Sequence, residues 1–287
     1  MSPQAAILAA LAAASVFYVA VWLAELRKKF PKPSAESLLT GFVTNFFDTL
    51  GLGSFAPSTA IFKFRRMVPD ELIPGTLNAG YTLPVILQAF IYIAAIQVDP
   101  LTLVLLIAAA TAGGWFGAGK VAGLPRRKVQ IGVGGALLVA VVAILMRQFD
   151  LFPQGGSGLE LRGWRLATGV AGNFLFGAIS TLGIGFYAPC MTMVSLLGMN
   201  PAAAFPIMMG SGAFLMPAAS ARFVRSGAYF APVALGLTVG GLAGVPLAAF
   251  VVKSMPLGTL RWLVIVVVLY AAVVMLRSAT EPPQHTR

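Results

Sequence analysis

The sequence predicts an all-α integral membrane protein: an N-terminal anchor helix followed by two repeats of inverted topology, each a broken re-entrant helix hairpin and three transmembrane helices. Three observations predict this class: the composition, a duplicated pattern of glycine and proline, and the distribution of basic residues. Of the 287 residues, 58% are hydrophobic and 10% are charged, and the mean hydropathy is +0.87. Soluble domains carry about 25% charged residues, so the composition excludes a water-soluble fold.

The net charge of +11 does not indicate a nucleic-acid partner. The basic residues form short clusters between apolar segments, at 27–29 and 126–128 for example, and such clusters orient membrane proteins. Cys190 is the single cysteine and His285 the single histidine. The sequence therefore excludes an intrachain disulfide, a multi-cysteine metal site and a Ser-His-Asp catalytic set. We expect no cofactor, no metal and no enzymatic activity, and we interpret Cys190 as a packing residue.

The first apolar run, 7–26, is interpreted as a retained anchor helix. No basic residue precedes it, it is long, and a basic cluster follows it directly, which differs from a cleaved signal peptide. Segments long enough to cross about 30 Å of hydrocarbon follow at 73–96, 101–122, 129–146, 201–224, 230–252 and 257–276.

Two further apolar segments, 41–64 and 166–197, are interrupted by a Gly-x-Gly and then a proline, in "TLGLGSFAP" and "TLGIGFYAP". These strings begin a repeat, because glycines, prolines and threonines recur at one constant spacing. Chance similarity between apolar segments favours Leu, Ala and Val instead. The matched pairs include Thr49 and Thr181, Gly51 and Gly183, Gly53 and Gly185, Pro57 and Pro189, Pro69 and Pro201, Pro74 and Pro206, and Gly80 and Gly212.

The predicted organisation is an anchor and basic loop at 1–40, a first repeat at 41–147, a connecting loop at 148–165, a second repeat at 166–277 and a polar tail at 278–287. If both Gly-x-Gly segments dip into the bilayer and return, most Lys and Arg fall on one side, as the positive-inside rule requires. Each repeat then has three spans. Because three is odd, the second repeat begins on the opposite side of the membrane from the first, and the two repeats are inverted, as in many secondary transporters. The N-terminus is predicted outside and the C-terminus in the cytoplasm.

The hairpin tips are the predicted substrate site. At each tip a second helix arm begins, and its free N–H groups and positive dipole end suit an anion. The alternative is that the glycines only permit close helix packing, which we favour for Gly113, Gly114, Gly117, Gly240, Gly241 and Gly244. The tip candidates are Thr49, Gly51, Gly53, Ser54, Thr181, Gly183, Gly185 and Tyr187.

Thr76, Asn78 and Ser211 are candidate additional donors to the substrate, or partners in helix–helix hydrogen bonds. Asp48 is the one acid well inside an apolar segment, and such groups are costly to bury and commonly functional. We consider it a candidate proton- or cation-coupling group; alternatively it pairs with a basic residue or faces a water-filled vestibule. The matching position in the second half is Ser180.

From about residue 41 to 276 the chain resembles the sulfite exporter TauE/SafE family. Half one offers "FDTLGLGSFAP", "IPGTLNAG" and "GGWFGAGKVAGLPRRKVQ"; half two offers "GAISTLGIGFYAP", "MNPAAAFPIMMGSG", "RSGAYF", "GGLAGVPLAAF" and "KSMPLGTLRWL". Where the family has consecutive glycines, this chain has Gly53-Ser54-Phe55 and Gly185-Phe186-Tyr187.

The resemblance implies a multi-pass inner-membrane transporter that exports sulfite or a small organosulfonate anion. Two alternatives stay open: a proton- or cation-coupled importer of a small organic anion, and an anion channel.

Overall fold

The computed structural model describes residues 3–27, 31–121, 156–180 and 186–280, together with scattered single positions between 127 and 149. In these residues the secondary structure is helical and no strand forms; one isolated bridge joins Gly158 to Met199. The predicted all-α class is confirmed for the described chain. The predicted span at 129–146 falls largely outside the described residues.

The helices are α1 (Pro3–Leu26), α2 (Ala35–Thr49), α3 (Phe55–Arg65), α4 (Ile73–Ala95), α5 (Pro100–Val121), α7 (Gly163–Ser180), α8 (Tyr187–Leu196), α9 (Ala204–Ser226), α10 (Ala231–Ser254) and α11 (Leu257–Thr280). Among them, Pro3–Leu26, Ile73–Ala95, Pro201–Ser226 and Ala231–Val251 are long and apolar enough to cross a membrane. The described helices therefore fit a membrane protein, as the composition predicts.

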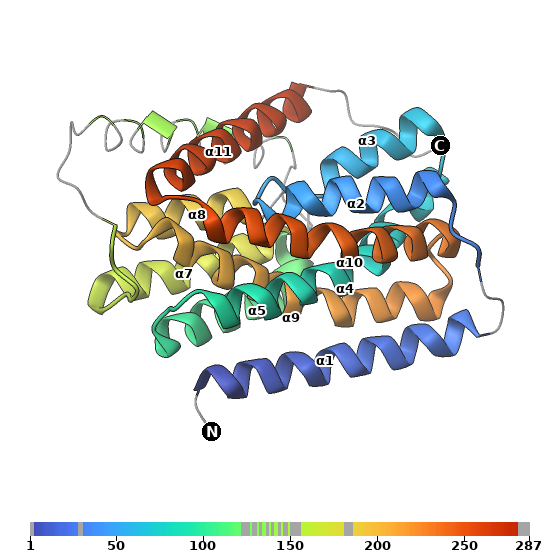
Figure 1. Cartoon of the computed structure of the whole chain (residues 1–287), viewed down its shortest axis with the longest axis horizontal. Helices are drawn as coiled ribbons and strands as arrows, with labels where there is room; N and C mark the ends of the chain where they lie inside the picture. Colours follow the sequence, from blue (N-terminus) through green and yellow to red (C-terminus); the bar gives the residue numbers. More distant parts are fainter. Residues whose placement is uncertain are drawn as a thin grey trace.

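Helix α1 lies along one edge of the molecule (Figure 1). One face of it is buried, through Ile7, Leu11, Tyr18, Trp22 and Leu26, and the Tyr18 hydroxyl donates a 2.7 Å hydrogen bond to the carbonyl of Ala79 on α4. Its other face exposes apolar side chains, including Val16 and Phe17. The predicted anchor is thus a helix that packs against the body and leaves an apolar surface open.

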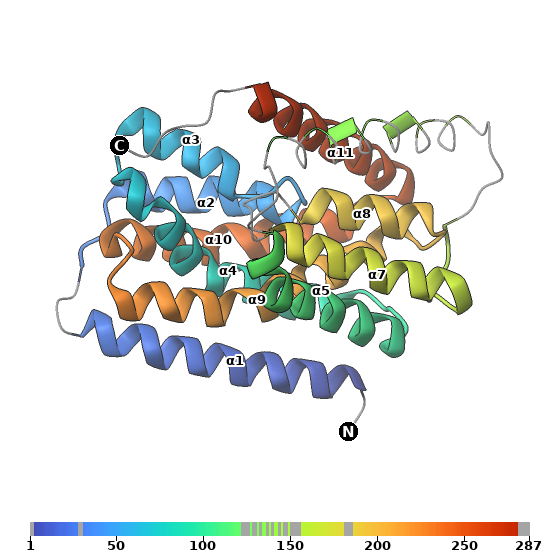
Figure 2. The same cartoon turned by 180° about the vertical axis from the view of Figure 1, so that it is seen from behind.

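Helices α2 and α3 form a hairpin. The Ser34 hydroxyl accepts a hydrogen bond from the Ser37 N–H and caps α2, so the helix begins at Ala35, earlier than the apolar run predicts. After Thr49 the helix breaks at Gly51 (φ 95°) and Gly53 (φ 81°), in the left-handed region that glycine tolerates best. Helix α3 then turns back alongside α2 (Figures 1 and 2), and its last residue, Arg65, pairs with Glu36 in the first turn of α2.

Helices α7 and α8 form a second hairpin at the other end of the molecule (Figures 1 and 2). The bridge between Gly158 and Met199 and a 2.7 Å hydrogen bond from the Asn200 N–H to the Gly158 carbonyl join the chain just before α7 to the chain just after α8. Residues 181–185, between α7 and α8, lie outside the described residues. In both views the turn between α2 and α3 and the facing ends of α7 and α8 lie near the middle of the molecule.

Glycines bring α2 against α10 and α5 against α7. A Cβ on Gly240 of α10 would lie 2.0 Å from the carbonyl oxygen of Leu38, and one on Gly113 of α5 would lie 1.9 Å from that of Phe174. Neither distance is possible, so both positions require glycine. A Cβ on Gly244 would lie 2.5 Å from the Phe42 carbonyl oxygen, and Cβ atoms on Gly114 and Gly241 would each lie 2.3 Å from a side chain, that of Leu215 and that of Asn45. The packing interpretation is confirmed for these five glycines, and the side-chain surroundings of position 117 lie outside what the structure describes.

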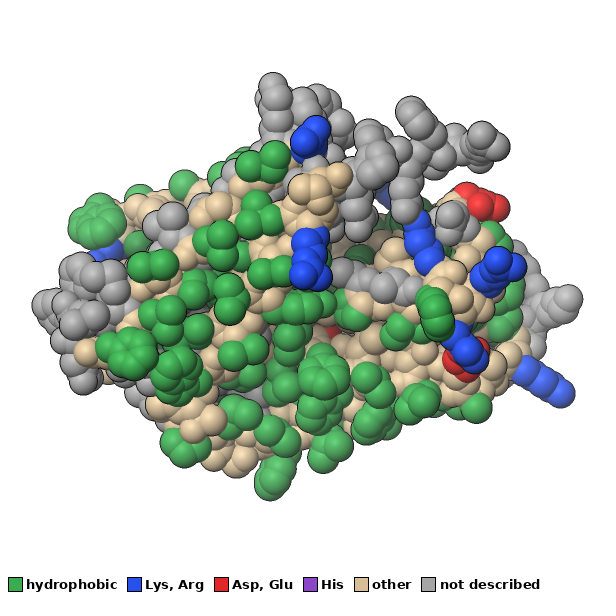
Figure 3. Space-filling view, turned by 90° about the horizontal axis from the view of Figure 1, so that it is seen from above, with side chains coloured by type: hydrophobic (Ala, Val, Ile, Leu, Met, Phe, Trp, Pro, Cys, Tyr) green, Lys and Arg blue, Asp and Glu red, His purple; other side chains and the backbone are tan. Residues whose placement is uncertain are grey.

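Apolar side chains cover much of the outer surface, as Figure 3 shows for one face. Trp115, Phe116 and Phe250 are each more than 60% exposed. Patches of this size are unusual on soluble monomers. They are expected where lipid replaces water.

Candidate functional site

Asp48 and Thr49 lie in the last turn of α2 and are the centre of a buried polar cluster. Their side chains are 2% and 0% exposed. The amide nitrogen of Gln88 on α4 donates to Asp48 Oδ2 at 2.9 Å and to Thr49 Oγ1 at 3.0 Å. A single amide therefore joins the tip of the first hairpin to the middle of a long apolar helix.

Ser54 opens the second arm of the hairpin, and both its hydroxyl and its backbone N–H bond to the Asp48 carboxylate. The predicted donor at the start of α3 is thus engaged by a carboxylate of the chain itself. Gly51 closes the turn, because its N–H donates to the Asp48 carbonyl at 2.8 Å. The N–H and hydroxyl donors of Ser54, predicted for a substrate anion, therefore face the side chain of Asp48, and anion binding at this tip stays a prediction.

Two tyrosines of α4 fix the hairpin from the same side as Gln88. The Tyr92 hydroxyl donates to the carbonyl of Thr49 at 3.0 Å. The Tyr81 hydroxyl shares hydrogen bonds with Thr44 of α2, at 2.6 Å, and with Ser58 of α3. Positions 81, 88 and 92 fall on one helical face, so α4 presents a polar stripe that holds both arms and the tip.

No described Lys or Arg forms an ion pair with Asp48. Helix α2 also has no basic residue in its last turn, where the negative end of the helix dipole opposes a carboxylate. An ionised carboxylate buried without a countercharge is strongly disfavoured. Two alternatives to a coupling role were considered for Asp48. A basic partner is not found in the described chain, and the residue, 2% exposed, is too buried to face an open vestibule.

Two acceptor atoms near this cluster lack a partner. Gln88 Oε1 and Asn45 Oδ1 are buried and accept no hydrogen bond in the described structure. Asn45 lies one turn before Thr49, whose hydroxyl donates to the Asn45 carbonyl at 2.7 Å. Buried side-chain oxygens are normally satisfied, so these two atoms require an explanation.

The second hairpin approaches the first through Tyr187, the first residue of α8. The Tyr187 hydroxyl and Val85 of α4 both lie against Gly212 of α9, at 3.4 Å and 3.2 Å from the position that a Cβ would occupy. The Asp48 carboxylate acts electrostatically on the same phenol. Thr181, Gly183 and Gly185 lie outside the described residues.

The structure does not bring all the predicted site residues together. Thr76 donates to the Leu72 carbonyl and accepts from the Phe230 N–H at 2.9 Å, and Asn78 donates to the Pro74 carbonyl. Both are near the start of α4, at the open end of the first hairpin and away from its tip. Ser211 is buried beside Gly212 and donates to Ile207.

Four members of the site were not predicted from the sequence: Gln88, Asn45, Tyr81 and Tyr92. A polar residue inside an apolar run could have indicated Gln88, which interrupts "LPVILQAFIYIAA". Polarity alone, however, does not identify the partner that a side chain contacts across helices.

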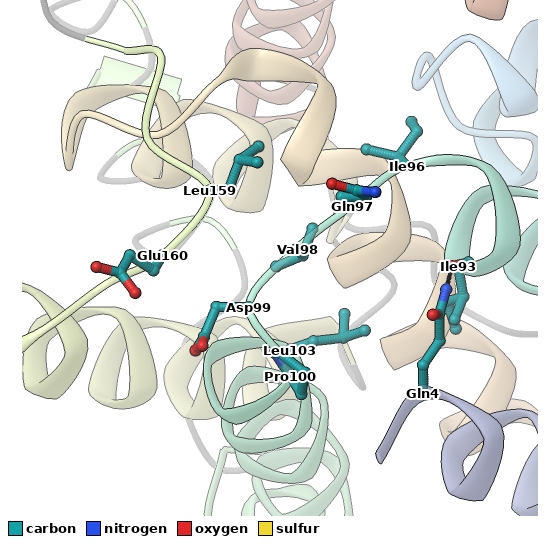
Figure 4. Close-up of a pocket in the computed structure, with 10 residues that line it drawn as sticks. All are labelled: Gln4, Ile93, Ile96, Gln97, Val98, Asp99, Pro100, Leu103, Leu159 and Glu160. Atoms are coloured by element: carbon teal, nitrogen blue, oxygen red, sulfur yellow. Dashed lines mark hydrogen bonds between the residues drawn. The ribbon is translucent and has the colours of Figure 1, made fainter. Parts of the chain in front are cut away.

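A pocket of about 410 Å³ lies between the N-terminal end of α1, the end of α4, the start of α5 and residues 159–160 (Figure 4). Asp99 caps α5 there, accepting from the N–H and the hydroxyl of Thr102, both at 2.9 Å. The Thr102 N–H and the nearby Arg162 hold the pKa of Asp99 below its usual range. Because its two carboxylates already have partners and Glu160 is exposed, we assign this pocket to a water-facing end.

Among the described residues, no three acidic, cysteine or histidine side chains gather as metal ligands. Comparisons of the chain with protein-family models, with curated proteins and with solved structures give no match. The resemblance to the TauE/SafE family therefore stays a prediction, and the site has to be interpreted from its own geometry.

Proposed function

We propose that the protein is a secondary membrane transporter that carries a small anion, sulfite or a small organosulfonate, between two inverted repeats. The observation that carries the proposal is the pair of broken helix hairpins. They start from opposite ends of the molecule, and the inner ends of α2, α3, α7 and α8 lie near its middle. Broken helices that meet near the midplane form the binding sites of many secondary transporters.

The helix contacts support inverted duplication. The run "GGWFG" of α5 matches "GGLAG" of α10 and aligns Gly113 with Gly240, whereas the spacing that relates the two hairpins aligns Phe42 with Phe174. Gly113 packs on Phe174, and Gly240 packs on the segment Leu38 to Phe42. Each half therefore places its glycine helix against the first hairpin arm of the other half. In this architecture the hairpins are re-entrant, the N-terminus is outside and the C-terminus is in the cytoplasm of an inner-membrane protein.

The second tip is the better candidate for the anion. Asp48 already occupies the donors at the first tip, whereas the matching residue of the second half is Ser180, whose hydroxyl bonds to the Gly177 carbonyl. Helix α8 has no side-chain cap at Phe186 and no acid in its first turn, so its N-terminal N–H groups and dipole are favourable to a negative charge. Tyr187 would wall the same site.

The direction follows from electrostatics. With an inside-negative potential, each negative charge that leaves the cell gains about 2.3 kcal/mol per 100 mV. Export of sulfite or a sulfonate therefore requires no coupling ion. Uptake would require one, and the buried Asp48 favours a coupled importer as the second candidate. An anion channel is the third, and it predicts single-channel currents without counterflow.

Counterflow in proteoliposomes tests the carrier assignment. Vesicles are loaded with unlabelled sulfite, taurine, sulfoacetate or sulfate, and accumulation of labelled sulfite is followed against protein-free vesicles. Accumulation driven by a subset of these anions supports a carrier and identifies its substrate class. If folded protein gives no accumulation with any of them, the sulfur-anion assignment is wrong.

A further inference from the structure

The unpartnered oxygens at the first hairpin tip suggest a ligand that the protein's own residues do not supply. Gln88 Oε1 and Asn45 Oδ1 are buried acceptors without donors. Gln88 contacts the buried Asp48 carboxylate through its amide nitrogen, Asn45 lies one turn before Thr49 on α2, and Asp48 has no described basic partner. A second anion would be repelled by Asp48, whereas a cation can bind neutral acceptors and neutralise the carboxylate at the same time.

We propose that Asp48, Thr49, Gln88 and Asn45 form a binding site for a monovalent metal cation, Na⁺ in the first instance. Their side-chain oxygens are the hard ligands that such ions prefer. Asn45, Asp48 and Thr49 lie near the end of α2, and Gln88 contacts it from α4. The ends of broken helices bind Na⁺ in other transporters. The inference rests on the proposed transporter function, to which it adds the identity of the coupling ion.

The Gln88 amide can serve as donor or ligand without moving the helix. Its nitrogen now contacts Asp48 Oδ2 at 2.9 Å and Thr49 Oγ1 at 3.0 Å. The nitrogen and oxygen of a terminal amide have nearly the same shape. A half-turn of the amide therefore places Oε1 where the nitrogen now contacts the Asp48 carboxylate and the Thr49 hydroxyl.

The charge of the cluster selects a monovalent ion. Asp48 contributes one negative charge, and Thr49, Gln88 and Asn45 are neutral. The described side chains bonded to Asp48, Gln88 and Ser54, are also neutral. One Na⁺ makes the site neutral, whereas Ca²⁺ or Mg²⁺ would leave a buried positive charge, which is costly.

Binding of ²²Na⁺ to the purified full chain in detergent, in choline chloride and without transport substrate, tests the site. Wild-type protein is expected to bind about one Na⁺ per chain, and Asp48→Asn is expected to bind at least about tenfold more weakly. Glu71→Gln, which removes an exposed carboxylate on the η1 turn (Asp70–Leu72), should bind as wild type. Gln88→Leu should also lose Na⁺ binding, and it replaces Asp48→Asn as the test variant if Asp48→Asn does not fold.

The proposal is overturned if folded wild-type protein binds no Na⁺, or if folded Asp48→Asn or Gln88→Leu binds it as tightly as wild type. Displacement of Na⁺ by an equal concentration of Ca²⁺ would also overturn the monovalent assignment. A response to pH with none to Na⁺ would make the ligand a proton instead. Because no substrate is present, these results are independent of counterflow: lost Na⁺ binding leaves the carrier assignment intact, and failed counterflow leaves the ion site intact.

Discussion

The amide of Gln88 on α4 donates a 2.9 Å hydrogen bond to Asp48 at the tip of the first hairpin. This contact joins a broken helix to a continuous one at the buried acid of the hairpin tip. A change in the charge or position of Asp48 therefore alters a hydrogen bond to α4, a helix that also packs on α9 and α10. This bond links a candidate ion site to a helix that packs on helices of the other half.

Asp48→Asn is expected to abolish transport if coupling is essential, because an amide cannot neutralise a cation or exchange a proton. The measurement is labelled-anion transport in proteoliposomes with and without a Na⁺ gradient. Glu71→Gln is the control and should transport as wild type. Unchanged transport and unchanged gradient dependence in Asp48→Asn would remove the coupling role.

Gly53→Ala should lower the stability of the detergent-solubilised protein by about 1 kcal/mol, because φ at this position is 81° and left-handed backbone disfavours a Cβ. Space is not the cause, since no atom lies within 4 Å of the position of the new Cβ. Gly258→Ala is the matched control: it also meets no atom, and it stands in helix α11 without a positive φ. Thermal unfolding of both variants measures the difference. Equal melting temperatures would contradict the conformation assigned to the tip.

Tyr92→Phe should cost about 1 kcal/mol of stability, the usual contribution of a buried hydrogen bond. The variant removes the donor to the Thr49 carbonyl and keeps the ring, which packs on Phe205 at 5.0 Å between centroids. Tyr270→Phe changes a partly exposed tyrosine on α11 and should be neutral. If both variants unfold at the wild-type temperature, the Tyr92 contact does not hold the tip.

Gly113→Ala and Gly240→Ala should destabilise the protein to a similar extent, by more than about 2 kcal/mol, because each Cβ would overlap a backbone carbonyl that cannot move independently. Gly135→Ala, where a Cβ meets no atom, is the control. Thermal unfolding of the three variants distinguishes the outcomes. A tolerated Gly113→Ala beside a disruptive Gly240→Ala would count against equivalent packing in the two halves.

Asp99→Ala should lower stability at neutral pH by about 1 kcal/mol, as expected for loss of a helix cap. The pKa of Asp99 is lowered in the folded state, and the unfolded value is about 3.9. The ionised side chain therefore contributes stability above about pH 4, and that contribution is lost as the pH falls through the lower folded value. Asp99→Asn should keep the cap and lose the pH dependence. A pH profile of Asp99→Asn identical to wild type would contradict this assignment.

Much of the fold follows from the sequence because glycine and proline restrict the backbone locally. The break at Gly51 and Gly53 was predicted where it occurs, and α4, α5, α9, α10 and α11 match the predicted segments closely. The start of α2 was predicted too late, because Ser34 and Glu36 are polar and resemble a loop until the Ser34 cap is seen.

The candidate site was less predictable than the fold. Thr76 is nearer to the tip in the sequence than Gln88 is, but helix α3 carries the chain away from the tip, and Thr76 lies at the open end of the hairpin. Gln88 is distant in the sequence and lies at the tip. Which polar side chains meet depends on how helices pack against one another, and a single sequence does not encode that arrangement in any local pattern.

Cysteine accessibility in a Cys190→Ala background tests the central claim, two hairpins that enter the membrane from opposite sides. The reporters are Lys32→Cys and Arg65→Cys for the open end of the first hairpin, and Arg165→Cys and Leu196→Cys for that of the second, labelled in oriented vesicles with a membrane-impermeant maleimide. Inverted re-entrant hairpins predict that the first two react from one side and the last two from the other. Reaction of Lys32→Cys and Arg65→Cys from different sides, or of all four from the same side, would contradict it.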